Sequence, residues 1–387
     1  MTPDGTQLSP ADSQPARNIS CDVELARLRD AWRAVSTVSG DGSFTLAISR
    51  DAIRLLAQGQ VVAQATMPIA NATGLSVGEE FQLSLSNDSL AALGHGDLEK
   101  SGNLSLGDVK PEEGFVGILK LQTSFAIKWP YTLTKIGSAF IEEDTKSSLQ
   151  SIDPRTLRQA LAEIRDFAGE DDRAGNHLST LQICDEEAVG MSPAACHSVK
   201  ADRLSGISFR VPVRCSKVLS PLLGQLRPSE TQGGVLGDKC VLRDGCLTIV
   251  APLAPALPKW PDGGSPKAQF QLDVADLTGA IGAIVWQANK DNPVVALNVQ
   301  PEADALILTT AVPGGLATAS CPIASANRVQ EAELTLRFRA STLSSFSTRN
   351  DDAVLFQVFE HFVQIEQVSS GERRKTLLAV ERPRSYS

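Results

Sequence analysis

The sequence predicts an α+β chain that contains three tandem copies of one domain, each with two helices packed on antiparallel strands. Three observations predict this fold class. Similar elements recur in the same order, and their openings at Asp22, Asp153 and Asp273 lie 131 and 120 residues apart. Helical spacing of apolar residues alternates with strand-like spacing inside each copy. A composition of 42% apolar and 21% charged residues is typical of a globular chain.

A helix is expected at the opening of each copy. Each candidate begins with an aspartate, which can cap a helix N-terminus, and continues with apolar residues three or four positions apart. The three segments span residues 22–35, 153–167 and 273–286. A second, shorter helix is expected in each copy, over residues 88–93, 217–223 and 341–346.

Strand-like runs fill the rest of each copy, because apolar and polar residues alternate in them. They cover residues 44–48, 52–56, 81–85, 115–121 and 124–129 in the first copy, 178–183, 188–191, 209–213, 239–242 and 246–250 in the second, and 294–299, 305–309, 334–338, 354–359, 362–367 and 376–380 in the third. A repeat of about 115–125 residues is too long for a solenoid and indicates whole domains.

Polar and Pro/Gly-rich segments near residues 142–150 and 258–266 mark the expected domain boundaries. We therefore expect domains over residues 21–145, 146–262 and 263–387. Residues 1–20 are rich in Pro, Ser, Asp and Gln, and they are expected to form a disordered tail. They lack the apolar core of a secretory signal.

Composition limits the classes of function. A net charge of −9 argues against a protein that coats nucleic acid with its whole surface, although a local basic surface is compatible with it. No apolar run is long enough for a transmembrane helix, so we expect no membrane association. The seven cysteines are scattered and lack Cys-x-x-Cys spacing, which indicates a reducing cytoplasm rather than a disulfide framework or a zinc site.

The sequence gives little support for catalysis. Cys196 and His197 are adjacent, so in an extended chain they would point to opposite faces and form a poor nucleophile–base pair. The four histidines show no metal-ligand spacing. Glycine pairs such as Gly233–Gly234 lack the Lys and Ser/Thr of a phosphate loop. We therefore expect no enzyme activity, no metal and no cofactor.

With these features the chain resembles the bacterial β-type DNA sliding clamp, the β subunit of DNA polymerase III, over residues 20–384. The three-domain repeat carries most of the resemblance. Ala194–Val199 lies where the family has Thr-Asp-Gly-His-Arg-Leu, and only His197 of that motif is kept. Ala256–Asp262 is similar to a Leu-Pro-rich passage at the family's second domain junction, whereas Val250–Leu253 replaces its Phe-Pro-Asp-Tyr.

The resemblance implies a ring of two chains joined head to tail, with helices lining a hole for duplex DNA. Such a homodimer would act as a processivity factor that tethers a polymerase catalytic subunit and other replication or repair proteins to double-stranded DNA, without sequence preference. A separate clamp loader would open it. The alternative is a monomeric adaptor or decoy, which keeps the fold and binds clamp partners without encircling DNA.

Basic side chains on the helices are the candidates for DNA contact, because a sliding ring must touch phosphates without reading bases. Helical geometry places Arg155, Arg158 and Arg165 together, away from the apolar residues of their segment. Arginines on exposed helices also serve solubility and side-chain pairing, and this alternative stays open. The candidates are Arg27, Arg29, Arg33, Arg155, Arg158, Arg165, Arg214, Lys217, Arg339 and Arg349.

The resemblance also implies a pocket for a partner peptide between the second and third domains. Such a pocket would hold a short apolar peptide by a few anchor side chains. For one candidate, His197, a core histidine with its hydrogen bonds satisfied is the alternative. By position the candidates are His197, Val199, Leu253, Pro258, Val380 and Arg382.

Overall fold

The computed structural model divides the chain into two compact units. Unit 1 contains Met1–Lys146 together with Leu242–Val250, and unit 2 contains Ser147–Val241 together with Ala251–Ser387. The structure describes residues 18–40, 42–88, 101–107, 117–123, 126–133, 149–169, 178–259, 264–288, 294–299, 304–328, 334–340, 343, 353–369 and 371–380. The expected tail lies outside these residues up to position 17, whereas Ile19 is buried and Ser20 begins a strand.

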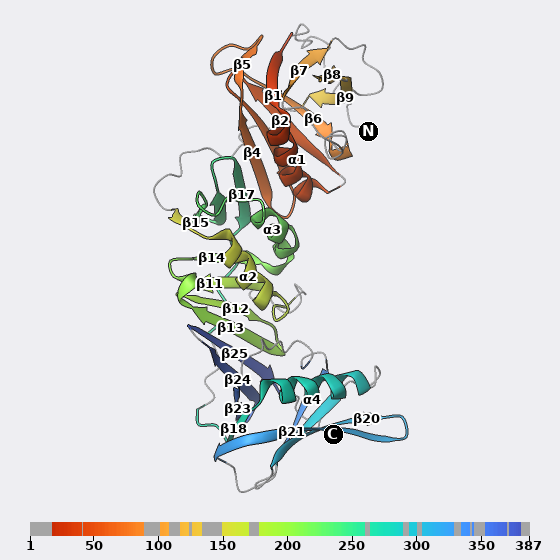
Figure 1. Cartoon of the computed structure of the whole chain (residues 1–387), viewed down its shortest axis with the longest axis vertical. Helices are drawn as coiled ribbons and strands as arrows, with labels where there is room; N and C mark the ends of the chain where they lie inside the picture. Colours follow the sequence, from red (N-terminus) through yellow and green to blue (C-terminus); the bar gives the residue numbers. More distant parts are fainter. Residues whose placement is uncertain are drawn as a thin grey trace, which may run out of the picture. The chain divides into compact units, whose positions relative to one another are not determined.

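Unit 1 consists of antiparallel strands with the helix α1 (Leu25–Ser39) packed on them (Figure 1). The strands are β1 (Ser20–Glu24), β2 (Ser43–Ser49), β3 (Ala52–Gln58), β4 (Val62–Pro68), β5 (Ala70–Thr73), β6 (Glu80–Ser86), β7 (Ser101–Gly107), β8 (Gly117–Gln122), β9 (Ala126–Leu133) and the first part of β17 (Leu247–Pro252). Neighbouring strands follow the order β17-β4-β3-β2-β6-β9-β8-β7-β1-β5.

Unit 2 is built on a twelve-stranded sheet of order β14-β11-β12-β13-β25-β24-β23-β18-β21-β20-β19-β22. Its helices are α2 (Pro154–Arg165), α3 (Ser216–Leu223) and α4 (Val274–Gln287), with short 3-10 turns η4 (Asp202–Leu204) and η5 (Val213–Cys215). Its strands are β10 (Gln150–Ser151), β11 (Thr180–Cys184), β12 (Glu187–Met191), β13 (Ala195–Ala201), β14 (Phe209–Pro212), β15 (Gln232–Leu236), β16 (Lys239–Arg243), β18 (Ala268–Leu272), β19 (Val294–Val299), β20 (Ala305–Val312), β21 (Gly315–Arg328), β22 (Leu334–Arg339), β23 (Val354–Val358), β24 (Phe362–Ser369) and β25 (Glu372–Ala379).

The same set of contacts occurs three times along the chain. The opening helix packs on one hairpin in each repeat: α1 on β3 and β4, α2 on β12 and β13, and α4 on β20 and β21. The strand before each helix pairs with a later strand of the same repeat, as β1 with β7, β10 with β15 and β18 with β23. Another pair, β2 with β6, recurs as β11 with β14 and β19 with β22. The predicted α+β fold of three tandem copies is therefore confirmed, whereas the exact boundaries between the copies stay predictions.

Two of the three expected helix caps are present. Asp153 accepts hydrogen bonds from the backbone N–H groups of Arg155 and Thr156, and Asp273 caps α4 in the same way. The cap expected at Asp22 is wrong, because Asp22 lies inside β1 and the helix begins only at Leu25. β1 pairs with both β5 and β7, so long-range sheet pairing prevails over the local capping pattern there.

Most expected strands are present with small shifts at their ends, but the sequence missed several others. The missed strands are β1, β4, β5, β7, β10, β13, β15, β18 and β21. Several of them contain small and polar residues and are stabilised by pairing with a strand on each side. An example is β13, with the sequence ACHSVKA, which lies between β12 and β25. Among the shorter helices, α3 is confirmed, whereas the segments expected at 88–93 and 341–346 lie almost wholly outside the described residues.

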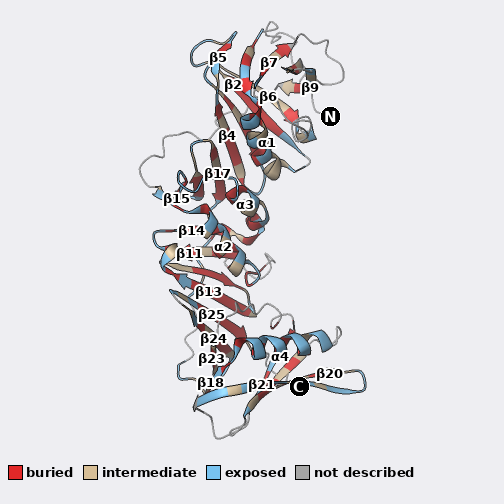
Figure 2. Ribbon diagram, in the orientation of Figure 1, coloured by how far each residue is buried: buried red, intermediate tan, exposed pale blue. Residues whose placement is uncertain are grey.

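The core lies between each opening helix and its strands, as the buried residues in Figure 2 show. The apolar residues predicted to face inward from α2, namely Leu157, Leu161 and Ile164, are all buried. In the third repeat, α4 covers a cluster that includes Phe270 and Phe338. The opposite side of each opening helix thereby faces away from the core.

Gly190 on β12 is a position where the packing of α2 tolerates no side chain. A Cβ at this residue would overlap the carbonyl oxygen of Ile164. Gly190→Ala should therefore lower the free energy of unfolding of unit 2 by about 2 kcal/mol or more, measured by urea denaturation. The control is Gly279→Ala on α4, where nothing lies within 4 Å of the added carbon, and it should raise stability by up to about 1 kcal/mol. Equal stability of the two variants would contradict the packing described here.

Candidate nucleic-acid interface and partner surface

Helix α2 presents three exposed arginines on one side. Arg155, Arg158 and Arg165 are exposed, whereas the apolar residues of the helix face the sheet. The Arg165 Nε atom lies 3.5 Å from the Asp166 carboxylate. Neither Arg155 nor Arg158 forms a salt bridge within the residues that the structure describes. The helix therefore presents cationic groups that a polyanion can contact.

Helix α1 also carries arginines, but carboxylates accompany them. Arg27 Nε lies 2.8 Å from Glu24, and Arg29 and Arg33 lie 3.9 and 3.8 Å from Asp30. Exposed ion pairs of this kind contribute little stability, about 0–1 kcal/mol each. A phosphate could replace the carboxylates, although they reduce the positive charge that α1 presents.

The remaining basic candidates are scattered. Arg214 in η5 and Lys217 in α3 are exposed, and Arg349 lies outside the described residues. Arg339 was expected on a helix, and this expectation is wrong. It is the last residue of β22 and pairs with Val294 of β19, because the strand continues to its end. No basic residue lies on α4.

His197, the first candidate for the partner pocket, is buried in the sheet–helix interface. Its side chain is 4% exposed, its ring stacks on Phe167 at 4.5 Å between centroids, and its Nδ1 forms a 2.8 Å hydrogen bond with the Thr376 hydroxyl. Burial, followed by the positive charge of Arg374, lowers the pKa of His197 to about 4. The imidazole is therefore neutral, as in a core histidine with a satisfied hydrogen bond.

A group of charges around the buried Arg374 lies beside His197 and joins α2, η4 and β25. Arg374, which is 5% exposed, pairs with Glu163 of α2 at 3.5 Å and with Glu372. Arg203 of η4 lies 2.9 Å from Glu372 and 3.8 Å from Glu163. Since these residues come from the second and third repeats, the charges fix the two repeats to each other within unit 2.

The other pocket candidates do not gather at one exposed place. Val199 is buried on the same side as His197, Val380 packs against the core of the third repeat, and Leu253 is half-buried. Pro258 is exposed, and Arg382 lies outside the described residues. Their role in partner binding stays a prediction.

A buried apolar cluster with a rim of half-buried side chains lies on the other face of β13, and the sequence did not predict it. Cys196 packs there with Val189, Met191 and Leu377, and three half-buried side chains border this group: Leu178, Leu257 and Phe362. We call these seven residues the outer apolar surface. Phe362 stacks on Phe359 at 4.6 Å, and the backbone N–H of Leu257 donates to Gln182 Oε1 at 3.0 Å. Successive side chains of a strand point to opposite faces. Once His197 is placed in the core, this rule assigns Cys196 to the other face.

The geometry of Cys196 and His197 argues against a catalytic pair. The two side chains point to opposite faces of β13, and burial, followed by the Glu187 carboxylate, raises the pKa of the Cys196 thiol.

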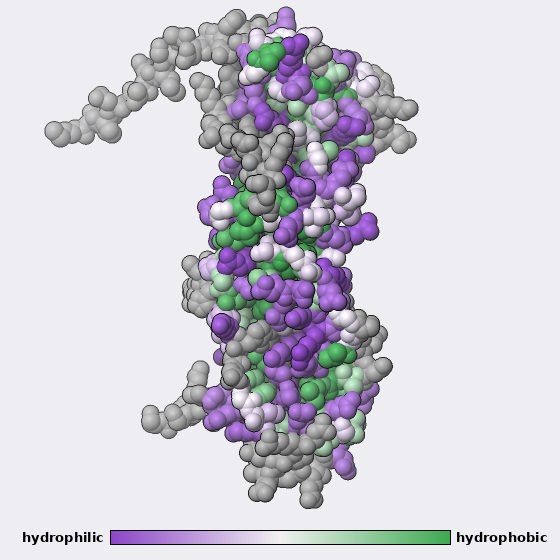
Figure 3. Space-filling view, turned by 90° about the vertical axis from the view of Figure 1, so that its left-hand side faces the viewer, coloured by the Kyte–Doolittle hydropathy of each residue, from purple (hydrophilic) through white to green (hydrophobic). Residues whose placement is uncertain are grey.

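Among the described residues no group of three or more His, Cys, Asp or Glu side chains could hold a metal ion. None of the described helices has both the length and the hydropathy needed to cross a bilayer. Figure 3 shows hydrophilic residues over much of the face in view, with hydrophobic residues in separate patches.

The neutral His197 makes the stability of unit 2 sensitive to pH. Its pKa is about 4 in the fold and near 6.5 in the unfolded chain, so the unfolded state binds more protons between these values. The free energy of unfolding should fall as the pH drops from about 6.5 towards 4, by up to about 3 kcal/mol. Urea denaturation across this range should show a weaker pH dependence for His197→Gln than for the wild type. The exposed His361→Gln variant is the control and should keep the wild-type dependence, and a His197→Gln variant that also keeps it would refute the assignment.

Comparisons with known proteins identify the fold. No protein-family model matches the sequence, and no curated protein matches it. The chain is similar to the solved DNA polymerase sliding clamp of Pseudomonas aeruginosa, with 14% identity, a TM-score of 0.69, and coverage of 94% of this chain and 100% of that one. It is also similar to the sliding clamp of Bacillus subtilis (10% identity, TM-score 0.70, coverage 95% and 100%) and to the β subunit of DNA polymerase III of Thermotoga maritima (12%, 0.69, 94% and 100%). The chain therefore has the fold of the bacterial β sliding clamps.

Proposed function

We propose that two copies of this chain close head to tail into a ring around duplex DNA and act as a processivity clamp for a DNA polymerase. The fold supports this proposal, since the solved structures that it resembles are sliding clamps. The observation that carries it is an antiparallel pairing between strands of successive repeats, which we call the joint. It occurs twice inside the chain, and the two strands that would form it once more each have an unpaired edge.

In each joint, a strand of one repeat pairs with the last strand of the next repeat. The first of these is the second strand of the hairpin on which the opening helix packs. In unit 1, Val62–Ala65 of β4 pairs with Leu247–Val250 of β17. In unit 2, the whole of β13 pairs with β25, from Ala195 opposite Leu378 to Ala201 opposite Glu372. Both ladders are antiparallel, and both extend a sheet of one repeat with a strand of the next.

In the third repeat β21 corresponds to β4 and β13, and in the first repeat β9 corresponds to β17 and β25. Neither strand forms such a joint with any residue that the structure describes. Within the described residues, Gly315–Cys321 of β21 pairs only with β20, and Ala126–Tyr131 of β9 pairs only with β8. Unpaired strand edges are ready templates for pairing with another chain. A second copy could satisfy both edges at once, and a head-to-tail contact that closes on itself gives a ring. Pro130 of β9 offers no N–H, so the ladder on that edge would be interrupted at this residue.

Two groups of side chains in unit 2 suit the other partners of such a ring. The arginines of α2 would contact DNA phosphates without reading bases. The outer apolar surface would hold an apolar peptide of the polymerase catalytic subunit or of another replication or repair protein. Since the sequence has no nucleotide-binding motif, a separate clamp loader would open the ring on closed DNA.

A linear duplex with biotin at both ends tests encirclement without a loader. Streptavidin added after binding should trap the protein at a salt concentration that strips it from the same duplex with open ends, because salt weakens phosphate contacts but not a topological link. Changing Arg155, Arg158 and Arg165 together to Glu should reduce trapping several-fold. The same charge reversal at Lys200, Lys239 and Lys259, three exposed lysines outside the helices, is the control and should leave trapping unchanged. Equal loss from blocked and open DNA would contradict encirclement.

The edge of β21 gives a test of ring closure. Leu316 is 73% exposed at the start of this strand. Leu316→Glu should weaken the dimer at least tenfold, because it places a charge beside the proposed ladder, and sedimentation would then show single chains. Val368→Glu on β24 is the control, since Val368 is 72% exposed away from this edge. A wild type that sediments as a single chain at every concentration would instead favour the monomeric adaptor.

A further inference from the structure

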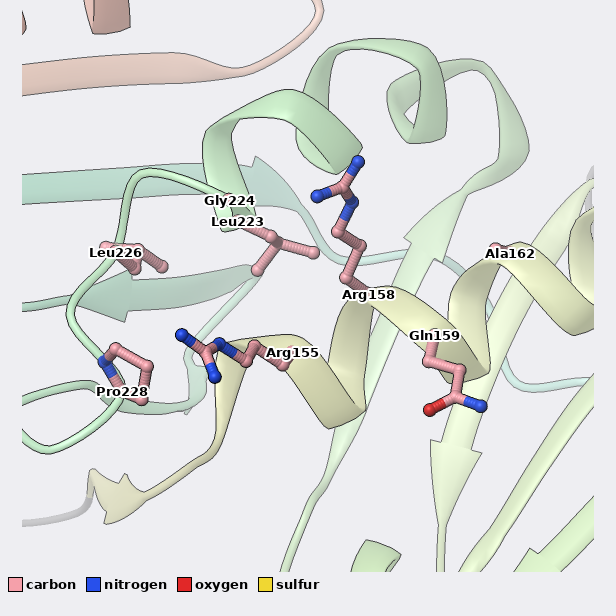
Figure 4. Close-up of a pocket in the computed structure, with 8 residues that line it drawn as sticks. All are labelled: Arg155, Arg158, Gln159, Ala162, Leu223, Gly224, Leu226 and Pro228. Carbon is pink, nitrogen blue, oxygen red and sulfur yellow. The ribbon is translucent and has the colours of Figure 1, made fainter.

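A hollow of about 390 Å³ lies in unit 2 between α2 and the segment that ends α3 and follows it (Figure 4). Arg155 and Arg158 border it from α2, and Leu223, Gly224, Leu226 and Pro228 border it from the other side. Figure 4 shows the two guanidinium groups extending towards this second segment, with Leu223 between them. Two cations of one helix therefore border the same hollow.

Arg158 is held in position by α3. Its Nε donates a 3.2 Å hydrogen bond to the hydroxyl of Ser220. Its guanidinium lies against Gly224, where a Cβ would stand only 3.2 Å from the terminal nitrogen Nη1. A held guanidinium loses less conformational entropy when it binds an anion, and its remaining donors match the geometry of a phosphate.

The surroundings leave the charges of this pair available to an anion. Leu223 and Leu226 are buried beneath the hollow, so its floor is apolar, and no carboxylate is among the described residues that line it. In the part of the chain that the structure describes, neither arginine has a salt bridge. Asp153 lies near Arg155, but both of its carboxylate oxygens already accept hydrogen bonds from the first turn of α2.

We infer that this hollow seats one phosphate group of the DNA backbone between Arg155 and Arg158. The inference rests on the proposed function and adds to it that two arginines share one phosphate at a time. Arg165 lies outside the hollow beside its own carboxylate partner, Asp166, and Arg27, Arg29 and Arg33 of α1 also have carboxylate partners.

The salt dependence of duplex binding counts the phosphates involved. The slope of log K against log salt changes by about 0.9 for each phosphate that a protein neutralises on double-stranded DNA. Fluorescence anisotropy with a labelled linear duplex should therefore show a loss of about 0.9 from the slope when Arg155 and Arg158 are both changed to Gln. A loss of about 1.8 would indicate two separate phosphates, and no loss would indicate no contact. Either result would overturn the shared seat.

Gly224→Val tests the geometry while both charges are kept. The added side chain should displace the Arg158 guanidinium and weaken duplex binding about three- to tenfold. The control Gly279→Val on α4, where nothing lies within 4 Å of a Cβ, should leave binding unchanged. Thermal unfolding of each variant shows that the fold is kept. Unchanged binding by a folded Gly224→Val variant would contradict the inference.

Inorganic phosphate separates a failure of this inference from a failure of the proposed function. Line broadening of the phosphorus resonance should report binding to the wild type and its loss in Gly224→Val. Suppose that the wild type binds the duplex and that the double Gln variant and Gly224→Val bind it equally well. This result would refute the shared phosphate site but not the proposed clamp function. Phosphate binding without any duplex binding would refute both DNA roles and assign the hollow to a free phosphate-bearing molecule.

Discussion

The pairing of β13 with β25 is the contact on which the rest of unit 2 depends, because it makes one sheet from two repeats. Beneath it, Arg374 and Glu163 are paired with little access to water, and His197 is neutral. Removing one partner of a buried ion pair costs about 3–5 kcal/mol, so these charges favour a single register of the two strands. The arginines of α2, the hollow beside α3 and the outer apolar surface all belong to elements that this joint holds in place.

Three copies of one backbone carry three different exposed surfaces. The arginines of α1 are accompanied by Glu24 and Asp30, those at the start of α2 have no salt bridge within the described residues, and α4 has no basic residue. The exposed side of α4 instead carries two glycines and Trp286, which is 81% exposed. Buried positions thus keep the fold common to the repeats, whereas the exposed positions differ, and a DNA contact would be concentrated on the second repeat.

Local patterns predicted the parts of this fold that local interactions decide. The opening helices with caps at Asp153 and Asp273 follow from residues within one or two turns. Asp22 has the same pattern, but partners some 50 and 80 positions away draw it into a strand, as the pairing with Ala70 and Asn103 shows. The face of His197 was likewise undecidable from the sequence, because Phe167 and Thr376 determine it.

The sequence predicted which arginines belong to the candidate site better than it predicted which other residues lie around them. The arginines of α2 are where helical spacing put them, since an exposed helix face depends on the helix alone. The hollow depends on Ser220 and Gly224, which come from a different helix and its end, and no spacing rule connects them to Arg158. The outer apolar surface likewise combines residues from β12, β13, β24 and β25 with Leu178 and Leu257.

Single-particle images of the purified protein would decide whether two copies form a ring. We expect a closed ring of two chains, of about 82 kDa or twice the 41.1 kDa of one chain, with a hole wide enough for a duplex. Particles that contain one open chain, or two chains joined without a central hole, would contradict it.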